Sequence, residues 1–438
     1  MTRADIIQAA FKAWGRDYYR STSLSEVARE LGVSKPALYR HFCNKQALLE
    51  AMYEWFLDDY AAKVQDGFLR ATAAEPNEAI SIMIRAIMSY YAHNAYLFIF
   101  SIVHVYGERR LGNPQEFLAK RGIDMGIFSN VWKIAPFPRA IQMILATLTF
   151  AMAYYHQLGP SGRTASGIQD ERIEQDISLV LCIVSAGLGF QKKGIETLDY
   201  GLLEEKVSGI GRKIEENELL HSVAEAVASA GPWGVSMKMV ARVSGLSKSG
   251  LYAHFKNKGD MLAQLFLTEF DRIINFAEES IGFSANPEER LYLAIFAICD
   301  YLRSRPDVLI ALDWLRVRRI EVSDPEGWKI PPRLYRVFRD VQQPLEISRR
   351  FPNIESDWIP AWILFLIFTS LMHGVLVDTT RFMEWLNMPK LSRRKLSREA
   401  FARVSNESFR NLYQFIVRGL DSPSFTSAPP PDTGGEGI

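Results

Sequence analysis

A segment of 25 residues occurs twice in this chain of 438 residues. Residues 25–49 read SEVARELGVSKPALYRHFCNKQALL and residues 238–262 read KMVARVSGLSKSGLYAHFKNKGDML, with 13 of the 25 aligned positions identical and no gap. The copies lie 213 residues apart, which is close to half of the chain. A repeat of this period constrains the whole architecture. The sequence therefore predicts two similar halves, each the size of a subunit.

Composition places the chain among folded proteins. With 48% hydrophobic and 23% charged residues it can bury large cores, and its length predicts two to four domains. The net charge of +1 provides no overall attraction for nucleic acid or an anionic membrane, so any basic surface must be local. The three cysteines Cys43, Cys182 and Cys299 have no CxxC spacing, which favours reduced thiols. No signal segment is recognisable at the N-terminus, so we expect a cytoplasmic protein.

Outside the repeated segments, apolar residues recur at helical spacing and no stretch alternates as a strand would, so the predicted class is all-α. Polar loops are expected at 159–167 and 388–397, and a disordered tail at 422–438. The expected helices of the two halves cover residues 76–94, 96–110, 114–133, 138–158 and 170–190, and residues 287–305, 306–322, 332–351, 358–381 and 398–420.

One of these helices begins with an apolar stretch long enough to span a membrane. Residues 358–377 read WIPAWILFLIFTSLMHGVLV, about the ~20 residues that a span requires. Its counterpart at 139–158 contains Arg139, Gln142 and His156 and would span poorly. A pair of helices packed inside a bundle fits both stretches better than a membrane span.

The repeated segment has the pattern of a helix-turn-helix. Ser23 is placed to cap the first helix, and Glu26 completes a capping box. Gly32 provides the left-handed backbone that ends this helix. Ser34 caps the second helix, and Pro36 lies in its first turn, where a missing amide is harmless. The residues expected to pack inward are Val27, Ala28, Leu31, Leu38 and Phe42.

The outer face of this second helix is basic. It carries Lys35, Arg40 and Lys45, and no acidic residue lies between positions 34 and 45. This is the local positive footprint that binding to nucleic acid requires.

The second copy repeats the inner design with a different outer face. Ser236 and Ser247 are the expected caps and Gly245 the turn residue. Ala253 replaces Arg40, so this copy lacks the arginine that could bind guanine in two-pronged fashion and should discriminate bases less well. Gly250 weakens its helix by up to ~1 kcal/mol relative to alanine. The other features are Val240, Ala241, Leu251 and Phe255 inside, Met239 in place of the capping-box acid, and Ser244 in place of Leu31.

The segments VSKPALYRHFCNKQALL and LSKSGLYAHFKNKGDML resemble the DNA-binding signature of TetR-like transcriptional regulators, over residues 6–57 and 219–270. One departure is Tyr18, where the family usually has a glycine that the second copy keeps as Gly231. The resemblance implies two tandem subunits, each with an N-terminal helix-turn-helix domain and a larger helical domain for ligand binding and dimerisation, forming an intramolecular pseudo-dimer. The expected divisions are DNA-binding domains at 1–47 and 204–260, regulatory domains at 48–203 and 261–421, and the tail.

The resemblance also implies which residues meet DNA. Phosphates would be contacted by tyrosine, histidine and lysine side chains, and base edges by the remaining outward positions. The contact residues carried over in this way are Ser34, Lys35, Pro36, Ala37, Tyr39, Arg40, His41 and Lys45 in the first copy, and Ser247, Lys248, Ser249, Gly250, Tyr252, Ala253, His254 and Lys258 in the second.

A ligand pocket and its polar lining are the other expectation. Aromatic-rich helices such as those around Tyr90 and Trp314 could line an apolar cavity, although core packing is the more common explanation for such helices. No spacing indicates a metal or a cofactor, and none indicates an enzyme, because P-loop, GxSxG and HExxH patterns are missing. The candidate polar lining residues are His93, His104, His156, Asp313 and His373.

These observations lead to one functional hypothesis and one alternative. We expect a cytoplasmic, non-enzymatic repressor that binds an asymmetric operator with two half-sites in double-stranded DNA and responds to a small-molecule effector. One chain would act as the functional unit. The alternative is a ligand-sensing or interaction protein of the same fold in which one or both motifs no longer bind DNA.

Overall fold

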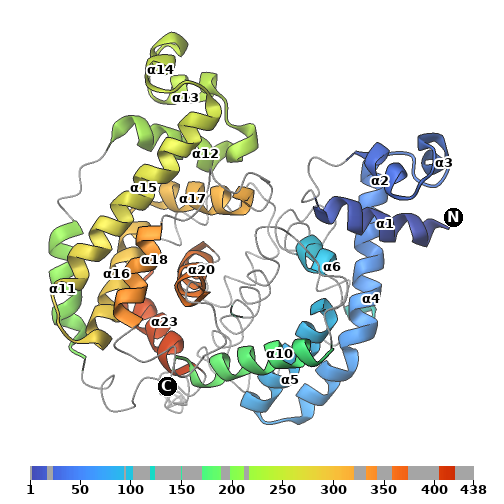
Figure 1. Ribbon diagram of the computed structural model, residues 1–438, viewed down its shortest axis with the longest axis horizontal. Coiled ribbons are helices and arrows are strands. Elements are labelled where there is room, and N and C mark those ends of the chain that lie inside the picture. Colours follow the sequence, from blue (N-terminus) through green and yellow to red (C-terminus); the bar gives the residue numbers. More distant parts are fainter. Residues whose placement is uncertain are drawn as a thin grey trace, which may run out of the picture. The chain divides into compact units, whose positions relative to one another are not determined.

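The structure of the protein is a computed structural model that describes residues 2–16, 23–92, 95–101, 119–123, 149, 170–188, 198–211, 217–319, 332–342, 358–372 and 404–419. Its regular elements are all helices, and no strand occurs within these ranges, so the all-α prediction is confirmed (Figure 1). The described helices belong to two compact units, and the boundary between the units falls within α10, after Cys182.

The first unit begins with one helix ahead of the first repeated segment, continues with the two short helices of that segment, and then enters a long fourth helix. Its helices are α1 (Arg3–Arg16), α2 (Leu24–Glu30), α3 (Lys35–Tyr39), α4 (Lys45–Ala73), α5 (Pro76–Ala92), α6 (Ala95–Phe100) and most of α10 (Asp170–Ala186). Phe11 on α1 packs with its ring centroid 5.0 Å from that of Phe100 on α6 and 5.4 Å from that of Trp55 on α4. Aromatic packing therefore joins α1 to α4 and α6, two helices that come later in the chain.

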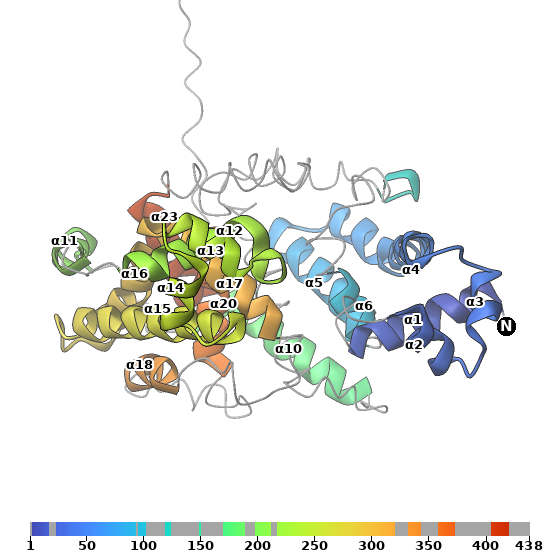
Figure 2. The same ribbon diagram turned by 90° about the horizontal axis from the view of Figure 1, so that it is seen from above.

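The second unit is built around a single buried helix. Its helices are α11 (Tyr200–Gly211), α12 (Glu218–Gly234), α13 (Met237–Val243), α14 (Lys248–His254), α15 (Lys258–Ile281), α16 (Pro287–Ser304), α17 (Pro306–Arg319), α18 (Pro332–Gln342), α20 (Trp358–Met372) and α23 (Asn406–Arg418). Every residue of α16 from Leu291 to Cys299 is buried, and α11, α15, α17, α18, α20 and α23 all pack against this helix (Figures 1 and 2). Such a helix is apolar on all sides because neighbours surround it.

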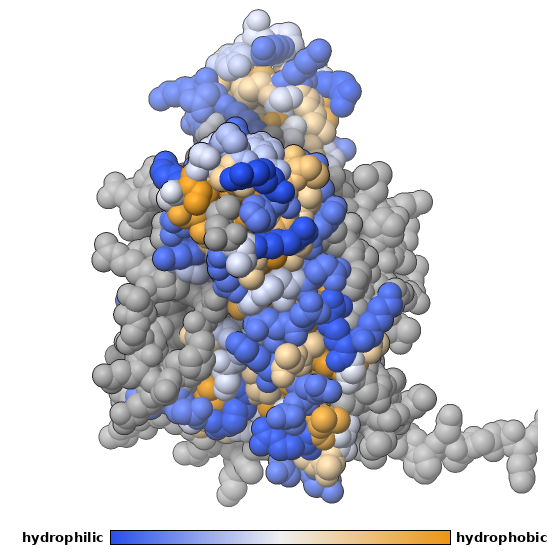
Figure 3. Space-filling model, turned by 90° about the vertical axis from the view of Figure 1, so that its right-hand side faces the viewer, coloured by the Kyte–Doolittle hydropathy of each residue, from blue (hydrophilic) through white to orange (hydrophobic). Residues whose placement is uncertain are grey.

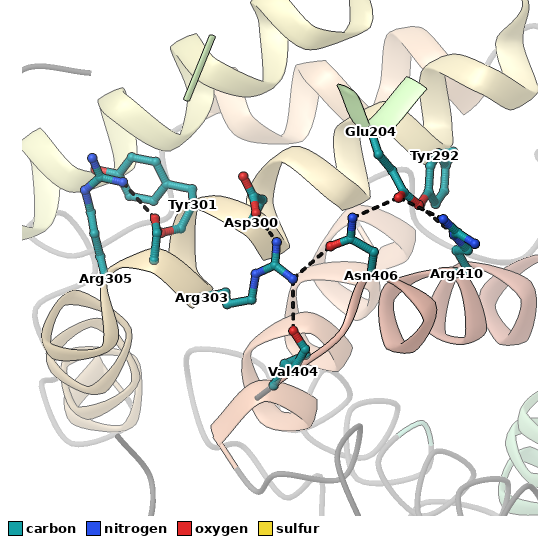
Figure 4. A network of polar contacts seen from close by, with 10 residues as sticks. Glu204, Tyr292, Asp300, Tyr301, Arg303, Arg305, Val404, Asn406 and Arg410 are labelled. Atoms are coloured by element: carbon teal, nitrogen blue, oxygen red, sulfur yellow. Dashed lines mark hydrogen bonds and ion pairs between the residues drawn. The ribbon is translucent and has the colours of Figure 1, made fainter. Parts of the chain in front are cut away.

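A buried polar network ties α11 to α16 and α23 (Figure 4). The carboxylate of Glu204, which is 5% exposed, accepts hydrogen bonds from Tyr292 Oη at 2.6 Å, Asn406 Nδ2 at 2.8 Å and Arg410 Nε at 2.6 Å. Burial raises the pKa of this carboxyl, but the three donors outweigh burial and hold the pKa below its ordinary value. Arg303, also on α16, extends the network by donating to Asn406 Oδ1 at 2.8 Å.

Two glycines contact each other at the ends of α10 and α23, within the second unit. Gly187 and Gly419 both have left-handed backbones, with φ of 60° and 59°. A Cβ atom on Gly187 would lie 2.5 Å from the amide nitrogen of Gly419, and one on Gly419 would lie 2.6 Å from that of Gly187. The amide of Leu188 donates to the carbonyl of Ile416 at 2.9 Å. This crossing of helix ends therefore has no room for a larger residue at either position.

Several expected helices are observed with adjusted ends. Of the helix expected at 398–420, residues 398–403 lie outside the described residues, and the described part is α23, which begins at Asn406 after the N-cap Ser405, whose hydroxyl accepts from the amide of Ser408 at 3.3 Å. The helix expected at 170–190 ends at Ala186, where Gly187 reverses the backbone. The single helix expected at 114–133 is wrong at Gly122, which forms a turn with φ of 82°. The helix α11 was not expected from the sequence.

The described part of the apolar stretch at 358–377 packs inside the helices of the second unit. This part is α20, 15 residues long, and most of its side chains are buried in the second unit. Within the described ranges, none of the helices combines the length and apolar character that crossing a membrane requires.

Candidate nucleic-acid interface

The first helix-turn-helix forms with the predicted caps. Ser23 Oγ accepts from the amide of Glu26 at 3.4 Å while the Glu26 carboxylate accepts from the amide of Ser23, which completes the capping box. Gly32 has φ of 65° and ends α2. Ser34 Oγ then accepts from the amide of Ala37 at 3.4 Å and begins α3. Local sequence therefore accounts for both helix starts and for the turn.

The second helix-turn-helix has the same local geometry with a simpler first cap. Ser236 Oγ accepts from the amide of Met239 at 3.3 Å, and with methionine at this position there is no reciprocal carboxylate. Gly245 has φ of 70°. Ser247 Oγ accepts from the amide of Gly250 at 3.0 Å and begins α14.

The inner faces of both motifs are equivalent. Leu38 and Leu251 are 0% exposed, and Phe42 and Phe255 are 1% and 2% exposed. Leu38 and Leu251 lie on the second helix of each motif, and Phe42 and Phe255 lie four residues further on, just past the end of that helix. Leu31 is only half-buried, so its replacement by Ser244 in the second copy costs less apolar burial than the sequence suggested.

The predicted contact residues lie mainly on the solvent side. Tyr39 and Tyr252 are 43% and 47% exposed, although tyrosine usually hides most of its ring. Lys35 Nζ lies 5.8 Å from the Tyr39 ring centroid, and Lys248 Nζ lies 6.0 Å from that of Tyr252. The other exposed members are Ser34, Pro36, Arg40, Ser247, Ser249, Ala253 and His254; Ala37, His41, Lys45, Gly250 and Lys258 are half-buried.

The described surface drawn in Figure 3 is mostly hydrophilic, and its apolar residues form small, separate groups. A tyrosine and a lysine side by side on such a surface provide a hydroxyl and an ammonium donor for one anionic strand. The same lysine–tyrosine pair occurs on both α3 and α14.

The two outer faces differ in length and in chemistry. The helix α3 ends at Tyr39, with Arg40 as its C-cap, whereas α14 continues to His254. Gly250 in α14 does not prevent the helix from forming, because Ser247 caps it. Arg40, at the end of α3, extends a guanidinium from the motif where Ala253 provides only a methyl group.

Most of the residues predicted to line a ligand pocket lie outside the described residues. His93, His104, His156 and His373 lie outside them, and Asp313 lies in α17 where only its backbone is described. Within the described ranges, no group of three His, Cys, Asp or Glu residues is placed to bind a metal ion.

A buried polar group that the sequence did not single out lies on α20. Ser370 is 0% exposed, and among the described residues its hydroxyl has no hydrogen-bond partner. Cys299 on α16 is a buried free thiol, and burial raises its pKa. A serine inside an apolar helix carries no periodic signal, so only tertiary packing reveals that this hydroxyl is unsatisfied.

Comparison with known families matches both motifs. The family of bacterial regulatory proteins, tetR family, matches residues 6–52 and again residues 219–265. The chain carries two tetR-family domains in tandem. Each match covers one helix-turn-helix, the helix before it and the start of the long helix after it, α4 or α15.

Curated relatives share the same segment. The chain is 42% identical over 53 residues to the uncharacterized HTH-type transcriptional regulator YuxN of Bacillus subtilis, covering 12% of this chain and 18% of that protein. It is 30% identical over 78 residues to the fatty acid metabolism regulator protein of Bacillus subtilis, covering 18% and 40%. It is 42% identical over 57 residues to the HTH-type transcriptional regulator TtgR of Pseudomonas putida, covering 12% and 27%. The matches thus span less than half of each relative.

Two solved structures are also similar to this chain. The TetR family transcriptional regulator PfmR from Thermus thermophilus matches with a TM-score of 0.31 and 17% identity, covering 47% of this chain and 98% of that one. The transcriptional regulator FadR from Bacillus subtilis in complex with stearoyl-CoA matches with a TM-score of 0.30 and 19% identity, covering 43% and 98%.

Proposed function

We propose that the protein is a sequence-specific DNA-binding transcriptional regulator, acting as a repressor, whose two tetR-family domains occupy two half-sites of one operator. The observation that carries this proposal is the double occurrence of one exposed Lys–Tyr pair, on α3 and α14, each on a capped helix after a glycine turn. Two such helices can dock in successive major grooves when half-sites are about one helical turn apart.

Within each motif the residues take separate roles. Tyr39, His41 and Lys45 set position through phosphates, and their counterparts are Tyr252, His254 and Lys258. Lys35 and Arg40 face base edges, and an arginine that donates two hydrogen bonds to guanine discriminates by about 1–3 kcal/mol. Because Ala253 stands where the first motif has Arg40, the operator is asymmetric, with the stricter half-site under the first motif.

A single chain is the functional unit in this proposal. The tandem repeat of a subunit-sized half within one chain supports pairing of the two halves as a pseudo-dimer within one polypeptide. In this proposal the DNA-binding domains are residues 1–47 and 204–260, the regulatory domains are residues 48–203 and 261–421, and residues 422–438 form a tail.

Effector binding is the remaining part of the proposal. A small molecule that binds the regulatory part more tightly in one arrangement of the motifs changes DNA affinity by the same factor through linkage. Ser370 on α20, whose buried hydroxyl has no hydrogen-bond partner among the described residues, is one candidate contact for such a molecule.

The experiment is selection from random duplex DNA by the purified full chain at physiological salt, followed by sequencing and a stoichiometry measurement on the selected site. We expect two unequal half-sites bound by one chain. A single enriched half-site would contradict the two-motif operator. Failure to enrich any sequence at any salt concentration would favour the alternative, a sensor or interaction protein whose motifs no longer bind DNA.

A further inference from the structure

The two helix-turn-helix motifs carry different charge over equivalent residues. Residues 23–45 contain four lysines and arginines and two glutamates, a formal charge of +2. Residues 236–258 contain five lysines and arginines and no acidic residue, a formal charge of +5. The motif that lacks the base-reading arginine is therefore the more basic of the two.

The additional charge arises from both gained lysines and lost carboxylates. Lys238 stands where the first motif has Ser25, and Lys256 where it has Cys43. Both lysines are exposed. The two glutamates of the first motif, at positions 26 and 30, correspond to Met239 and Val243 in the second, and both of these are half-buried.

The carboxylates of the first motif have structural partners there. Glu26 forms the capping box with Ser23, and Glu30 lies 3.5 Å from Lys12 Nζ of α1. The second motif begins its first helix with Ser236 alone and has no carboxylate on α13. The nearest downstream acid, Asp260, accepts a hydrogen bond from the amide of Lys256 at 2.7 Å. The first motif is thus built with more local polar contacts, and the second with more positive charge.

We propose that the second motif is the electrostatic anchor of the protein on DNA, and that Lys238 and Lys256 contact phosphates in addition to the residues the family resemblance implies. This proposal rests on the proposed function. In a helix-turn-helix the first helix crosses the phosphate backbone, which suits Lys238 at the start of α13. Phosphate contacts supply affinity for any sequence and base contacts supply specificity. The first motif is then the reader and the second the anchor.

The test is the salt dependence of DNA binding by the full chain. Each phosphate contact contributes a slope of about −0.9 to a plot of log affinity against log salt. The double variant Lys238→Ser with Lys256→Ser should therefore have a slope that is less steep, with a magnitude smaller by about 1.8. Over a fourfold rise in salt, the wild-type chain should lose about 12-fold more affinity than the double variant. The loss at low salt should be equal for the selected operator and for a duplex of mixed sequence.

A matched control separates a local contact from a general charge effect. Lys206 is an exposed lysine on α11 in the same unit, and Lys206→Ser should leave the slope unchanged. The reciprocal variant Ser25→Lys should make the slope steeper, with a magnitude larger by up to about 0.9. An unchanged slope in the double variant, or a loss confined to the selected operator, would overturn the anchor role. Failure of the proposed function would be seen separately, as wild-type protein that binds no duplex.

Discussion

Glu204 on α11 accepts two hydrogen bonds from the guanidinium of Arg410 on α23, from Nε at 2.6 Å and from Nη2 at 2.9 Å. Residues 212–217 connect α11 to α12, the first helix of the second tetR-family domain. The Glu204–Arg410 pair therefore holds α11, the helix that precedes the second tetR-family domain, against α23, the last described helix in the sequence. Its partners Tyr292 and Asn406 complete the satisfaction of a carboxylate that would otherwise be costly to bury.

Glu204→Gln should destabilise the second unit by about 2 kcal/mol at neutral pH, because buried donors lose a charged acceptor. The pKa of Glu204 is held below its ordinary value in the folded protein, so its stabilisation is present above the ordinary carboxyl pKa and is lost as pH falls through the folded pKa. The difference in unfolding free energy between wild type and variant should therefore shrink in acid. Urea denaturation at several pH values measures it. The exposed neighbour variant Glu205→Gln should show neither effect.

Gly187→Ala and Gly419→Ala should each destabilise the protein, because the new methyl group meets backbone and the backbone is left-handed. Each cost should exceed the ~1 kcal/mol of left-handed strain alone. The matched control is Gly209→Ala on α11, where nothing lies within 4 Å of the added Cβ and the helix should gain up to ~1 kcal/mol. The thermal unfolding midpoint and the molecular mass in solution of each variant are compared with those of the wild type. A neutral Gly419→Ala variant would show that the helix ends do not meet in solution.

Arg40→Ala should relax base preference at one half-site and cost about 1–3 kcal/mol of operator binding, if the guanidinium donates two hydrogen bonds to guanine. The reciprocal variant Ala253→Arg should sharpen preference at the other half-site. Repeated selection from random duplex DNA measures both. Selected sequences identical to those of the wild type would remove Arg40 from the base-reading set.

Ser23→Ala should destabilise α2 more than Ser236→Ala destabilises α13. The first change disrupts a reciprocal capping box, and the second removes one hydrogen bond. Each loss is expected to be about 0.5–2 kcal/mol. Hydrogen exchange of the two first turns compares them directly within one protein. Equal protection losses would contradict the difference in caps.

The sequence by itself determined the local architecture of the two motifs. Caps, glycine turns and inner leucine–phenylalanine pairs depend on residues no more than a few positions apart, so Ser34, Gly32 and Phe42 could be placed from their spacing. Gly187, at the end of α10, is a local helix-ending signal as well, although the apolar spacing continues past it and predicts a helix to Phe190. The candidate contact residues followed from the motif and from family resemblance; most of them are exposed, and Ala37, His41, Lys45, Gly250 and Lys258 are half-buried.

Tertiary structure decided the features that depend on distant parts of the chain. Glu204 and Arg410 are 206 residues apart, and no periodicity indicates that one of many glutamates is buried against one of many arginines. The contact between Gly187 and Gly419 and the unsatisfied hydroxyl of Ser370 likewise depend on the packing of residues that are distant in the sequence. Local hydrogen bonds are encoded by neighbouring residues, whereas burial and long-range pairing arise only when the whole chain packs.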